Sequence, residues 1–417
     1  MTRAPTPALV ASLHEYDSVG PEQGAWWDPA SKLLALVRTS AGDVAGARRW
    51  VVPAIRGPHP QQSGRCRWGR PVGVDTLRRL SAFYGRRRRH ATAAGVEGGA
   101  RMSEATAGNA VGEAVRAGVA AGPLFLVGVP RSGTTLLYKL LCLHPDAAYI
   151  SNWMRTAPAV PALALANRLT PRFADTRRTT WFGADRANAY VNGEPMAWRK
   201  QLFPRPVEGE PFYRSCGLAV PDSAGRPDMG RLQRLPGMLG AVCRYGGGRV
   251  FVSKYLANNH HIPALAELFP SARFVSIVRD GRAVACSLSR VHWWPDLTVW
   301  WYGGTPGRWQ AEGRDPWELC ARHWVRELAV LEQGLAAVPA ARRLEIRYEA
   351  LVAEPLATMR QLAAFAGLAD RWDWVQELAR LRYPNRNERW YSRLDPQVRG
   401  RIEAIQGDDL RRLGYLG

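Results

Sequence analysis

From residue 124 onward, short apolar runs of strand length alternate with longer segments in which apolar residues recur at helical spacing. The strand-like runs are LFLVGV at 124–129, RVFVSK at 249–254, RFVSIV at 273–278 and RRLEIRY at 342–348. The helical segments span 134–144, 261–269, 281–291, 316–338 and 355–368. Strands separated by helices of this length need crossover connections, so the pattern predicts an α/β fold with a parallel sheet flanked by helices on both faces.

The first 120 residues do not share this alternation. They contain RRRR at 86–89, followed by a Gly/Ala-rich stretch with little apolar periodicity. Such a segment cannot bury enough apolar surface to offset the entropy lost on ordering. We therefore expect a flexible or poorly structured extension over 1–120 and one folded domain over 121–417. Two interpretations of residues 1–101 stay open. They are either a flexible extension of the protein or an upstream stretch translated from a misplaced start codon, in which case Met102 would be the first residue.

Two long segments interrupt the alternation within the predicted domain. Residues 150–248 are rich in Pro, Arg and aromatic residues, and residues 291–309 are rich in Trp. Loops of this length in an α/β domain usually serve as lids or substrate walls. We expect the segment 150–248 to be an insertion on the substrate side of the site.

The formal charge of +21 favours nucleic-acid binding at first sight, because basic proteins gain affinity by releasing counterions from phosphate backbones. However, the basic residues are mostly Arg and are spread along the whole chain, and no recognition motif accompanies them. We expect a basic site for a small polyanion rather than a nucleic-acid partner.

The six cysteines lack a Cys-x-x-Cys pair, and no histidines stand at the spacing of metal ligands. The N-terminus lacks a signal-peptide pattern, and no 18 apolar residues run together. These observations favour a reduced, cytoplasmic protein with no membrane span and no metal.

The first strand leads into a phosphate-loop frame, Gly128-x-x-x-x-Gly133-Thr134-Thr135. Backbone N–H groups and the helix dipole at such a loop attract an anion. A nucleotide triphosphatase would carry Lys at position 134 to hold phosphates, whereas here the cation is Arg131. No acidic residue directly follows an apolar strand where a magnesium-holding Asp is expected. The loop therefore predicts an anion bound without a bridging metal.

A second cationic element follows the third predicted strand. Arg279 ends that strand, and Ser287 lies eight residues later in the next helix. If this strand lies beside the first, Arg279 presents a fork of donors to a second phosphate, with Ser287 as a hydroxyl partner. An Arg-Asp pair after a strand is also typical of a salt-bridged helix start, so both interpretations stay open.

These segments together resemble the sulfotransferase superfamily, whose members use 3′-phosphoadenosine 5′-phosphosulfate (PAPS). VPRSGTTLL resembles the 5′-phosphosulfate loop, in the Arg-containing form of tyrosylprotein and many bacterial members, and FVSIVRDGRAVACS resembles the 3′-phosphate element. The resemblance covers 124–144 and 249–417 in the family's order. It implies PAPS as co-substrate, no metal, and contacts from Arg131, Ser132, Gly133, Thr134, Thr135, Arg279, Ser287, Tyr348 and Arg389.

The resemblance also implies in-line transfer of a sulfuryl group to a hydroxyl or amine of a small-molecule acceptor. We expect Arg131 to stabilise the charge that grows on the phosphate–sulfate bridging oxygen, and Lys254 to assist it. The residues that act as the base in the family are not found at the matching positions. Cytosolic relatives carry Lys-Thr-His, whereas this chain continues after Lys254 with Tyr255 and Leu256. Tyrosylprotein-type relatives carry a Glu at the position of Asn152. Glu210 is the leading candidate for the base, and the other candidates are Glu194, Glu208 and His292.

Aromatic residues of the two inserted segments either line an acceptor cavity or pack these segments onto the sheet. They are Trp153, Trp181, Phe182, Trp198, Phe203, Phe212, Tyr213, Trp293, Trp294, Trp300 and Trp301. If these residues line a cavity, a small hydroxylated or aromatic metabolite is favoured as the acceptor. Two alternatives to the sulfotransferase stay open. One is a phosphate-loop kinase or nucleotide triphosphatase, and the other is a non-catalytic basic binding protein that kept the fold.

Overall fold

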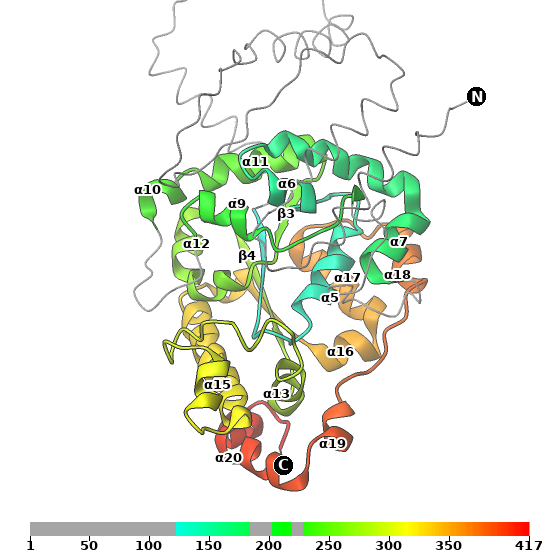
Figure 1. Ribbon diagram of the computed structural model, residues 1–417. Helices are drawn as coiled ribbons and strands as arrows, with labels where there is room; N and C mark the ends of the chain where they lie inside the picture. Colours follow the sequence, from blue (N-terminus) through cyan, green and yellow to red (C-terminus); the bar gives the residue numbers. More distant parts are fainter. Residues whose placement is uncertain (1–121, 184–201, 219–227, 417) are drawn as a thin grey trace, which may run out of the picture. The chain divides into compact units, whose positions relative to one another are not determined.

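The computed structural model describes residues 122–183, 202–218 and 228–416 (Figure 1). The predicted extension over 1–120 lies outside the described residues, as do the candidate base Glu194 and the aromatic residue Trp198. The extension therefore stays a prediction.

Five parallel strands form one sheet in the order β2-β3-β1-β4-β5. Their bounds are β1 (Leu124–Val127), β2 (Ala147–Ala148), β3 (Val250–Ser253), β4 (Arg273–Val278) and β5 (Arg343–Arg347). The central strand β1 pairs with β3 on one side and β4 on the other, with Leu124 opposite Val252 and Arg273. The predicted α/β fold is confirmed. The two-residue strand β2 was missed because it is too short to show periodicity.

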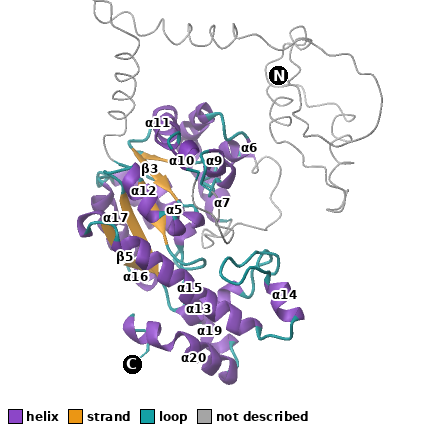
Figure 2. Cartoon of the chain, turned by 90° about the vertical axis from the view of Figure 1, so that its left-hand side faces the viewer, coloured by secondary structure: helices purple, strands orange, loops and turns teal. Residues whose placement is uncertain are grey.

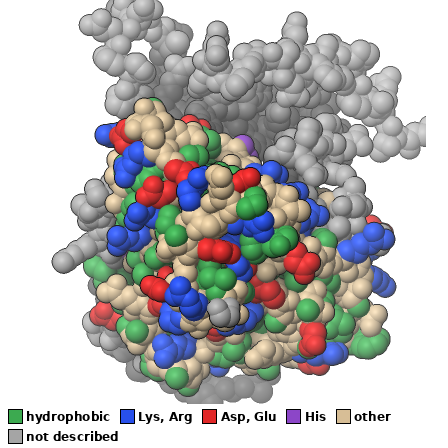
Figure 3. Space-filling model, turned by 90° about the horizontal axis from the view of Figure 1, so that it is seen from below, with side chains coloured by type: hydrophobic (Ala, Val, Ile, Leu, Met, Phe, Trp, Pro, Cys, Tyr) green, Lys and Arg blue, Asp and Glu red, His purple; other side chains and the backbone are tan. Residues whose placement is uncertain are grey.

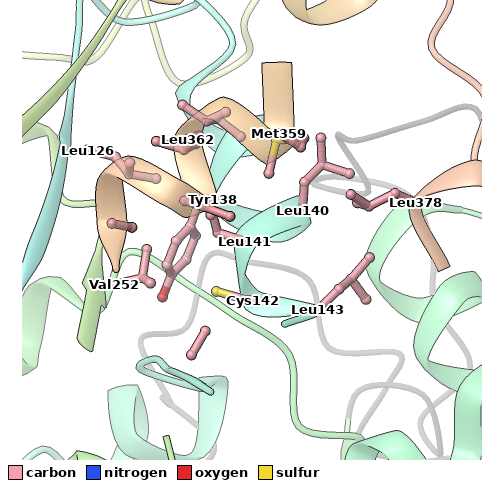
Figure 4. Packing of buried hydrophobic residues seen from close by; sticks show 14 of the residues in the cluster. Leu126, Tyr138, Leu140, Leu141, Cys142, Leu143, Val252, Met359, Leu362 and Leu378 are labelled. Atoms are coloured by element: carbon pink, nitrogen blue, oxygen red, sulfur yellow. The ribbon is translucent and has the colours of Figure 1, made fainter. Parts of the chain in front are cut away.

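One face of the sheet is covered by α5 (Thr134–Cys142), α17 (Pro355–Ala366) and α18 (Trp372–Ala379). Leu126 of β1 points to this face, since successive side chains of a strand alternate between faces. In the close-up, Tyr138 and Leu141 of α5 lie in one cluster with Leu126 and Val252 of the sheet and with Met359 and Leu362 of α17 (Figure 4). Burial of each such side chain contributes about 2 kcal/mol, which anchors the helix that follows the phosphate loop.

The opposite face receives Phe125 of β1 and is covered by α11 (Leu235–Gly246), α12 (Ile262–Leu268) and the C-terminal part of α15 (Pro316–Ala336). Viewed from the side, the strands lie between layers of helices (Figure 2). Because both faces are buried, the central strands are continuous apolar runs, as in other parallel sheets. This burial explains why the strands could be recognised in the sequence.

The predicted helix boundaries agree with the structure within three residues. The helix α13 spans Gly281–Leu288, against the predicted 281–291, and α15 ends two residues before the predicted position. Asp315 caps α15 by accepting a hydrogen bond from the backbone N–H of Trp317 (2.9 Å). Gly367 ends α17 in the left-handed conformation (φ 73°), as its position predicted.

Where described, the insertion 150–248 consists of short helices that pack on the sheet. Besides α11, they are α6 (Asn152–Thr156), η3 (Pro161–Phe173), α7 (Ala174–Phe182), α9 (Glu210–Ser215) and α10 (Met229–Leu232). Four of the aromatic residues that were candidates for a cavity wall, Trp181, Phe182, Phe212 and Tyr213, are at most 2% exposed and belong to the two cores of the sheet. For these four, packing onto the sheet is the correct interpretation.

The remaining elements are η4 (Leu256–His260), α14 (Pro306–Ala311), η5 (Ala340–Arg342), α16 (Tyr348–Ala353), α19 (Arg389–Arg393) and α20 (Pro396–Arg412). Of these, η4 and α16 follow β3 and β5 closely, and η5 directly precedes β5. The Trp-rich segment 291–309 packs with α13, α15 and α20 in a separate apolar cluster. None of the helices within the described ranges has the length and hydropathy that a membrane crossing requires.

Candidate active site

The loop between β1 and α5 is folded so tightly that two of its positions have no room for a side chain. Gly133 has φ 100°, and a Cβ there would lie 2.6 Å from Cδ2 of Tyr348. Gly128 has φ 153°, and a Cβ there would lie 2.7 Å from the carbonyl oxygen of Ile277 in β4. Glycine is therefore required at both positions, and the loop lies against β4 and against the first residue of α16.

Arg131 lies in the middle of this loop and adopts a left-handed backbone conformation (φ 74°). Within the described ranges it is the only residue other than glycine with a positive φ. This conformation costs about 1–2 kcal/mol and persists only where the surroundings enforce it. The Nε of Arg131 donates a hydrogen bond to Oγ of Ser287 (3.1 Å), and its carbonyl accepts one from Nη1 of Arg279 (2.9 Å). The loop is thus tied to both residues of the second cationic element.

Arg279 directly follows β4 and is 5% exposed. Its guanidinium lies over the ring of Tyr348, 4.2 Å from the ring centroid. Besides the carbonyl of Arg131, it donates to Oδ1 of Asn387 (3.1 Å) and to the carbonyl oxygen of Arg386 (3.2 Å). Its partners are neutral, and among the described residues no carboxylate forms an ion pair with it. The charge of Arg279 is therefore available to an anion.

The alternative interpretation of Arg279, a salt-bridged helix start, is wrong. Asp280 caps α13 by accepting from the backbone N–H of Arg282 (2.9 Å), and it forms its ion pair with the guanidinium of the same residue (2.9 Å). Arg282 also pairs with Glu403 (2.8 Å). Burial would lower the pKa of Arg282, but the hydrogen bonds to Asp280 and Glu403 outweigh it and raise the pKa. Arg282 thus neutralises the aspartate and leaves Arg279 to the loop.

The start of α5 offers unsatisfied donors to an anion. Its N-cap is Gly133, which supplies no side-chain cap, and its first turn carries no acidic residue. Ser132 is 1% exposed, and its hydroxyl has no hydrogen-bond partner in the described part of the chain. A buried hydroxyl left in this way can hydrogen-bond to a ligand or to a water molecule.

The structure brings eight of the nine predicted cofactor-binding residues together at the carboxyl edge of β1 and β4. They are Arg131, Ser132, Gly133, Thr134, Thr135, Arg279, Ser287 and Tyr348. The ninth, Arg389, is exposed in the first turn of α19. It lies two residues after Asn387, whose amide oxygen holds Arg279, so its segment borders the same site.

Asn259 is a site residue that the sequence did not reveal. Its Oδ1 accepts from the backbone N–H of Gly128 (3.1 Å), and its Nδ2 donates to the carbonyl of the same glycine (3.0 Å). Nothing in the run ANNHH marks one asparagine over the other, and the contact spans 131 residues of sequence. The amide fixes the point at which β1 turns into the loop.

Glu327 of α15 connects this asparagine to the Trp-rich segment. Its carboxylate accepts hydrogen bonds from Nε1 of Trp300 (2.7 Å) and from Nε2 of His260 (3.3 Å), and it contacts Nδ2 of Asn259 (3.5 Å). Burial alone would raise the pKa of Glu327, but the hydrogen bonds and the charges of His260 and His323 outweigh it and lower the pKa to about 2. The carboxylate therefore stays ionised and links the two segments.

Comparison with known proteins now decides the family. The family model described as "Sulfotransferase family" matches residues 123–373, which is more than half of the chain. This chain belongs to the sulfotransferase family. Among its relatives is the omega-hydroxy-beta-dihydromenaquinone-9 sulfotransferase Stf3 of Mycobacterium tuberculosis, 25% identical over 321 residues, which are 70% of this chain and 75% of the relative.

A second relative of this sulfotransferase is the protein-tyrosine sulfotransferase of Drosophila melanogaster, 23% identical over 58% of this chain and 37% of the relative. Among solved structures, the sulfotransferase STF9 of Mycobacterium avium is 16% identical, with a TM-score of 0.46, over 74% of this chain and 80% of the other. The family assignment goes against the kinase or triphosphatase alternative, which also lacks its lysine at Thr134.

The predicted catalytic residues of the sulfotransferase differ in their surroundings. Lys254 is 3% exposed, lies just after β3 and forms an ion pair with Glu208. Glu210, the leading candidate for the base, instead begins α9 and pairs with Arg214 (3.3 Å) on an exposed helix face. His292 is exposed in the Trp-rich segment. Only Glu208 among the described candidates contacts another predicted catalytic residue.

The surface of the sulfotransferase can be viewed from the end at which α13, α19 and α20 lie (Figure 3). On this face, basic and acidic side chains are interspersed. Several exposed arginines are paired with carboxylates, such as Arg322 with Glu318 (2.7 Å) and Arg412 with Glu332 (2.8 Å). Part of the positive charge of the chain is thus neutralised locally.

Proposed function

We propose that this sulfotransferase moves a sulfuryl group from PAPS to a hydroxyl group of a small-molecule acceptor. The observation that carries the proposal is the direct link between two cations of separate strands. Arg279 donates to the carbonyl of Arg131, so one cation stands within the anion-binding loop and the other beside it. PAPS carries anionic groups on both its 5′ and 3′ positions, which matches two adjoining arginines.

In this proposal, the backbone N–H groups at the start of α5 and the hydroxyls of Ser132, Thr134 and Thr135 bind the 5′-phosphosulfate. The hydroxyl of Ser132, which has no hydrogen-bond partner among the described residues, and the helix start without a side-chain cap support this role. Arg279 and Ser287 bind the 3′-phosphate, since an arginine fork can make two parallel hydrogen bonds to a phosphate.

Tyr348 and Arg389 complete the proposed donor site. The Tyr348 ring supports the guanidinium of Arg279 and closes over Gly133, which favours a role in shaping the nucleotide pocket. Arg389 is exposed beside the segment that holds Arg279, where a long cationic side chain can reach a phosphate.

Chemistry at this site depends on charge stabilisation. Arg131 is placed to stabilise the negative charge that grows on the bridging oxygen as the sulfur–oxygen bond breaks, and Lys254 assists from the end of the neighbouring strand. Donors that are held in place before the reaction need little reorganisation, and one such donor typically contributes a factor of about 100 to 1,000 in rate. The enforced backbone of Arg131 is consistent with such preorganisation.

A hydroxylated small molecule is the proposed acceptor. The name of the mycobacterial relative specifies an omega-hydroxy menaquinone derivative, which is a small molecule with a hydroxyl group. The non-catalytic alternative is tested together with this proposal by nucleotide binding and by transfer.

The test is a calorimetric titration of the protein with 3′-phosphoadenosine 5′-phosphate and with ATP plus magnesium, followed by incubation of metabolite extracts with sulfur-labelled PAPS. We expect the bisphosphate to bind more tightly than ATP, and label to appear in organic products. Preference for ATP with magnesium would overturn the proposal in favour of a kinase. Binding of nucleic acid that persists at raised salt, with neither nucleotide bound, would support the non-catalytic alternative.

A further inference from the structure

An acceptor hydroxyl must lose a proton when it attacks sulfur, and the position at which tyrosylprotein-type relatives carry a glutamate is Asn152. The structure gives this asparagine a different task. Its backbone N–H donates to the carbonyl of Arg205 (3.0 Å), and its Oδ1 accepts from the backbone N–H of Arg205 (2.9 Å). Asn152 therefore fixes a distant segment of the insertion beside the end of β2.

This segment is held by a short antiparallel pairing. Ser151 forms a β-bridge with Pro206, and the backbone N–H of Val207 donates to the carbonyl of Ile150 (3.0 Å). The next residue along the chain is Glu208. The turn that follows it is equally confined, because Gly209 has φ 73° and a Cβ there would lie 2.7 Å from Cγ2 of Ile150. The β-pairing before Glu208 and the close packing of Gly209 after it fix the backbone position of Glu208.

Two contacts tie Glu208 and its neighbour Val207 to α5 and to the residue that follows β3. Tyr138, one helical turn after Thr134 on α5, donates its hydroxyl proton to the carbonyl of Val207 (3.3 Å). On the other side, the carboxylate of Glu208 meets the ammonium of Lys254. Lys254 follows Ser253, which lies opposite Phe125 of β1, so it stands at the carboxyl edge next to the strand that ends in the phosphate loop.

The exposure of the two partners suits proton transfer. Lys254 is buried, with 3% of its side chain exposed, whereas 42% of the Glu208 side chain is exposed. The buried ammonium contacts Oε1 and orients the carboxylate, while the exposed part of the side chain is open to a molecule arriving from solution. Glu210, two residues later, lies on the surface and pairs with Arg214, and within the described ranges no ion pair joins it to the edge of the sheet.

We propose that Glu208 is the general base of the reaction, supplied by the insertion in place of the carboxylate missing at Asn152. This inference rests on the proposed sulfotransferase activity. The hydroxyl proton of the acceptor moves to the Glu208 carboxylate while the acceptor oxygen forms a bond to sulfur. The bond between sulfur and the bridging oxygen breaks, its electron pair stays on the phosphate, and 3′-phosphoadenosine 5′-phosphate leaves. Lys254 is then a positioning residue for the base as well as a neighbour of the donor.

The experiment compares the wild-type protein with Glu208→Gln, using PAPS and two acceptors of different acidity, 4-nitrophenol and phenol. A general base contributes about 100-fold or more to the transfer rate, and it matters most for an acceptor that does not ionise by itself. We expect kcat with phenol to fall by about 100-fold in Glu208→Gln, and the loss with 4-nitrophenol to be at least about tenfold smaller. A merely structural role would reduce both rates by the same factor.

Controls separate this inference from the function on which it rests. Glu318→Gln, which removes another carboxylate paired with a cation, should leave both rates unchanged. Glu208→Gln should bind 3′-phosphoadenosine 5′-phosphate as the wild-type protein does, which shows that the variant is folded. If the wild-type protein transfers sulfate and Glu208→Gln matches it, or if Glu210→Gln alone shows the acidity-dependent loss, Glu208 is not the base. If the wild-type protein neither binds the bisphosphate nor transfers sulfate, the proposed function itself fails.

Discussion

Arg131 and Arg279 follow two neighbouring strands of the sheet, β1 and β4, whereas Glu208 comes from a loop that belongs to no strand of the sheet. The proposed donor side is therefore set by the pairing of β1 with β4, two strands that are covered by helices on both faces of the sheet. The acceptor side depends on a few hydrogen bonds between 150–152 and 205–207. The proposed donor site thus rests on the core of the fold, whereas the proposed acceptor side rests on a short pairing within the insertion.

The largest effect is expected from a substitution that weakens only the proposed donor side. Arg279→Ala removes the guanidinium proposed to bind the 3′-phosphate, and loss of one partner from a buried charge pair costs about 2–5 kcal/mol. We expect the affinity for 3′-phosphoadenosine 5′-phosphate to fall about 100-fold or more, as measured by calorimetry. Because adenosine 5′-monophosphate lacks the 3′-phosphate, its affinity should change much less.

The matched control for this prediction is Arg322→Ala, which removes an exposed arginine paired with Glu318. This variant should bind both nucleotides as the wild-type protein does. An equal loss of affinity for the bisphosphate and the monophosphate in Arg279→Ala would show that Arg279 supports the loop without reading the 3′-phosphate.

An intermediate effect is expected from a substitution at the contact between α5 and the insertion. Lys139 of α5 donates to the carbonyl of Trp181 in α7 (2.8 Å), and its pKa is lowered from 10.5 to about 7 by burial, with smaller contributions from Arg205 and Lys254. Between pH 7 and 10.5, the unfolded chain holds a proton at this position that the folded chain has lost. The free energy of unfolding therefore gains a term that rises with pH, by about 1.4 kcal/mol per unit.

The measurement is urea unfolding of the wild-type protein and of Lys139→Met at pH 7, 8 and 9. The difference in free energy of unfolding, wild type minus variant, should rise with pH over this range. A constant difference would mean that the ammonium is hydrated, and that the insertion does not close over α5 as described.

The smallest expected effect concerns the link from the Trp-rich segment to the loop. Trp300→Phe removes the hydrogen bond to Glu327, whose loss costs roughly 1 kcal/mol of stability because His260 still donates to the carboxylate. Asn259 keeps both bonds to Gly128, so the affinity for the bisphosphate should stay the same. Thermal unfolding and calorimetry measure the two quantities. A loss of affinity comparable to that of Arg279→Ala would place the Trp-rich segment within the donor site.

The sequence allowed prediction of those features that repeat or follow a motif. The run RFVSIV has the bounds of β4 because buried parallel strands are continuous apolar runs, and the spacing from Arg279 to Ser287 lies within one strand–helix unit. Asn259 and Asn387 could not be found, since each makes its contact across more than a hundred residues and leaves no local pattern. Glu208 and Glu210 cannot be distinguished by sequence alone, because the tight turn at Gly209 and the pairing with 150–152 decide which carboxylate reaches Lys254.

The ring of Tyr348 touches both ends of the proposed nucleotide site, since it fills the space beside Gly133 and supports Arg279. A smaller residue at 348 would open room at the glycine turn and at the same time withdraw support from the guanidinium. Directed evolution of this enzyme towards a different sulfuryl donor would therefore have to change positions 133, 279 and 348 as one set, because no single substitution among them can be accepted without consequences for the other two.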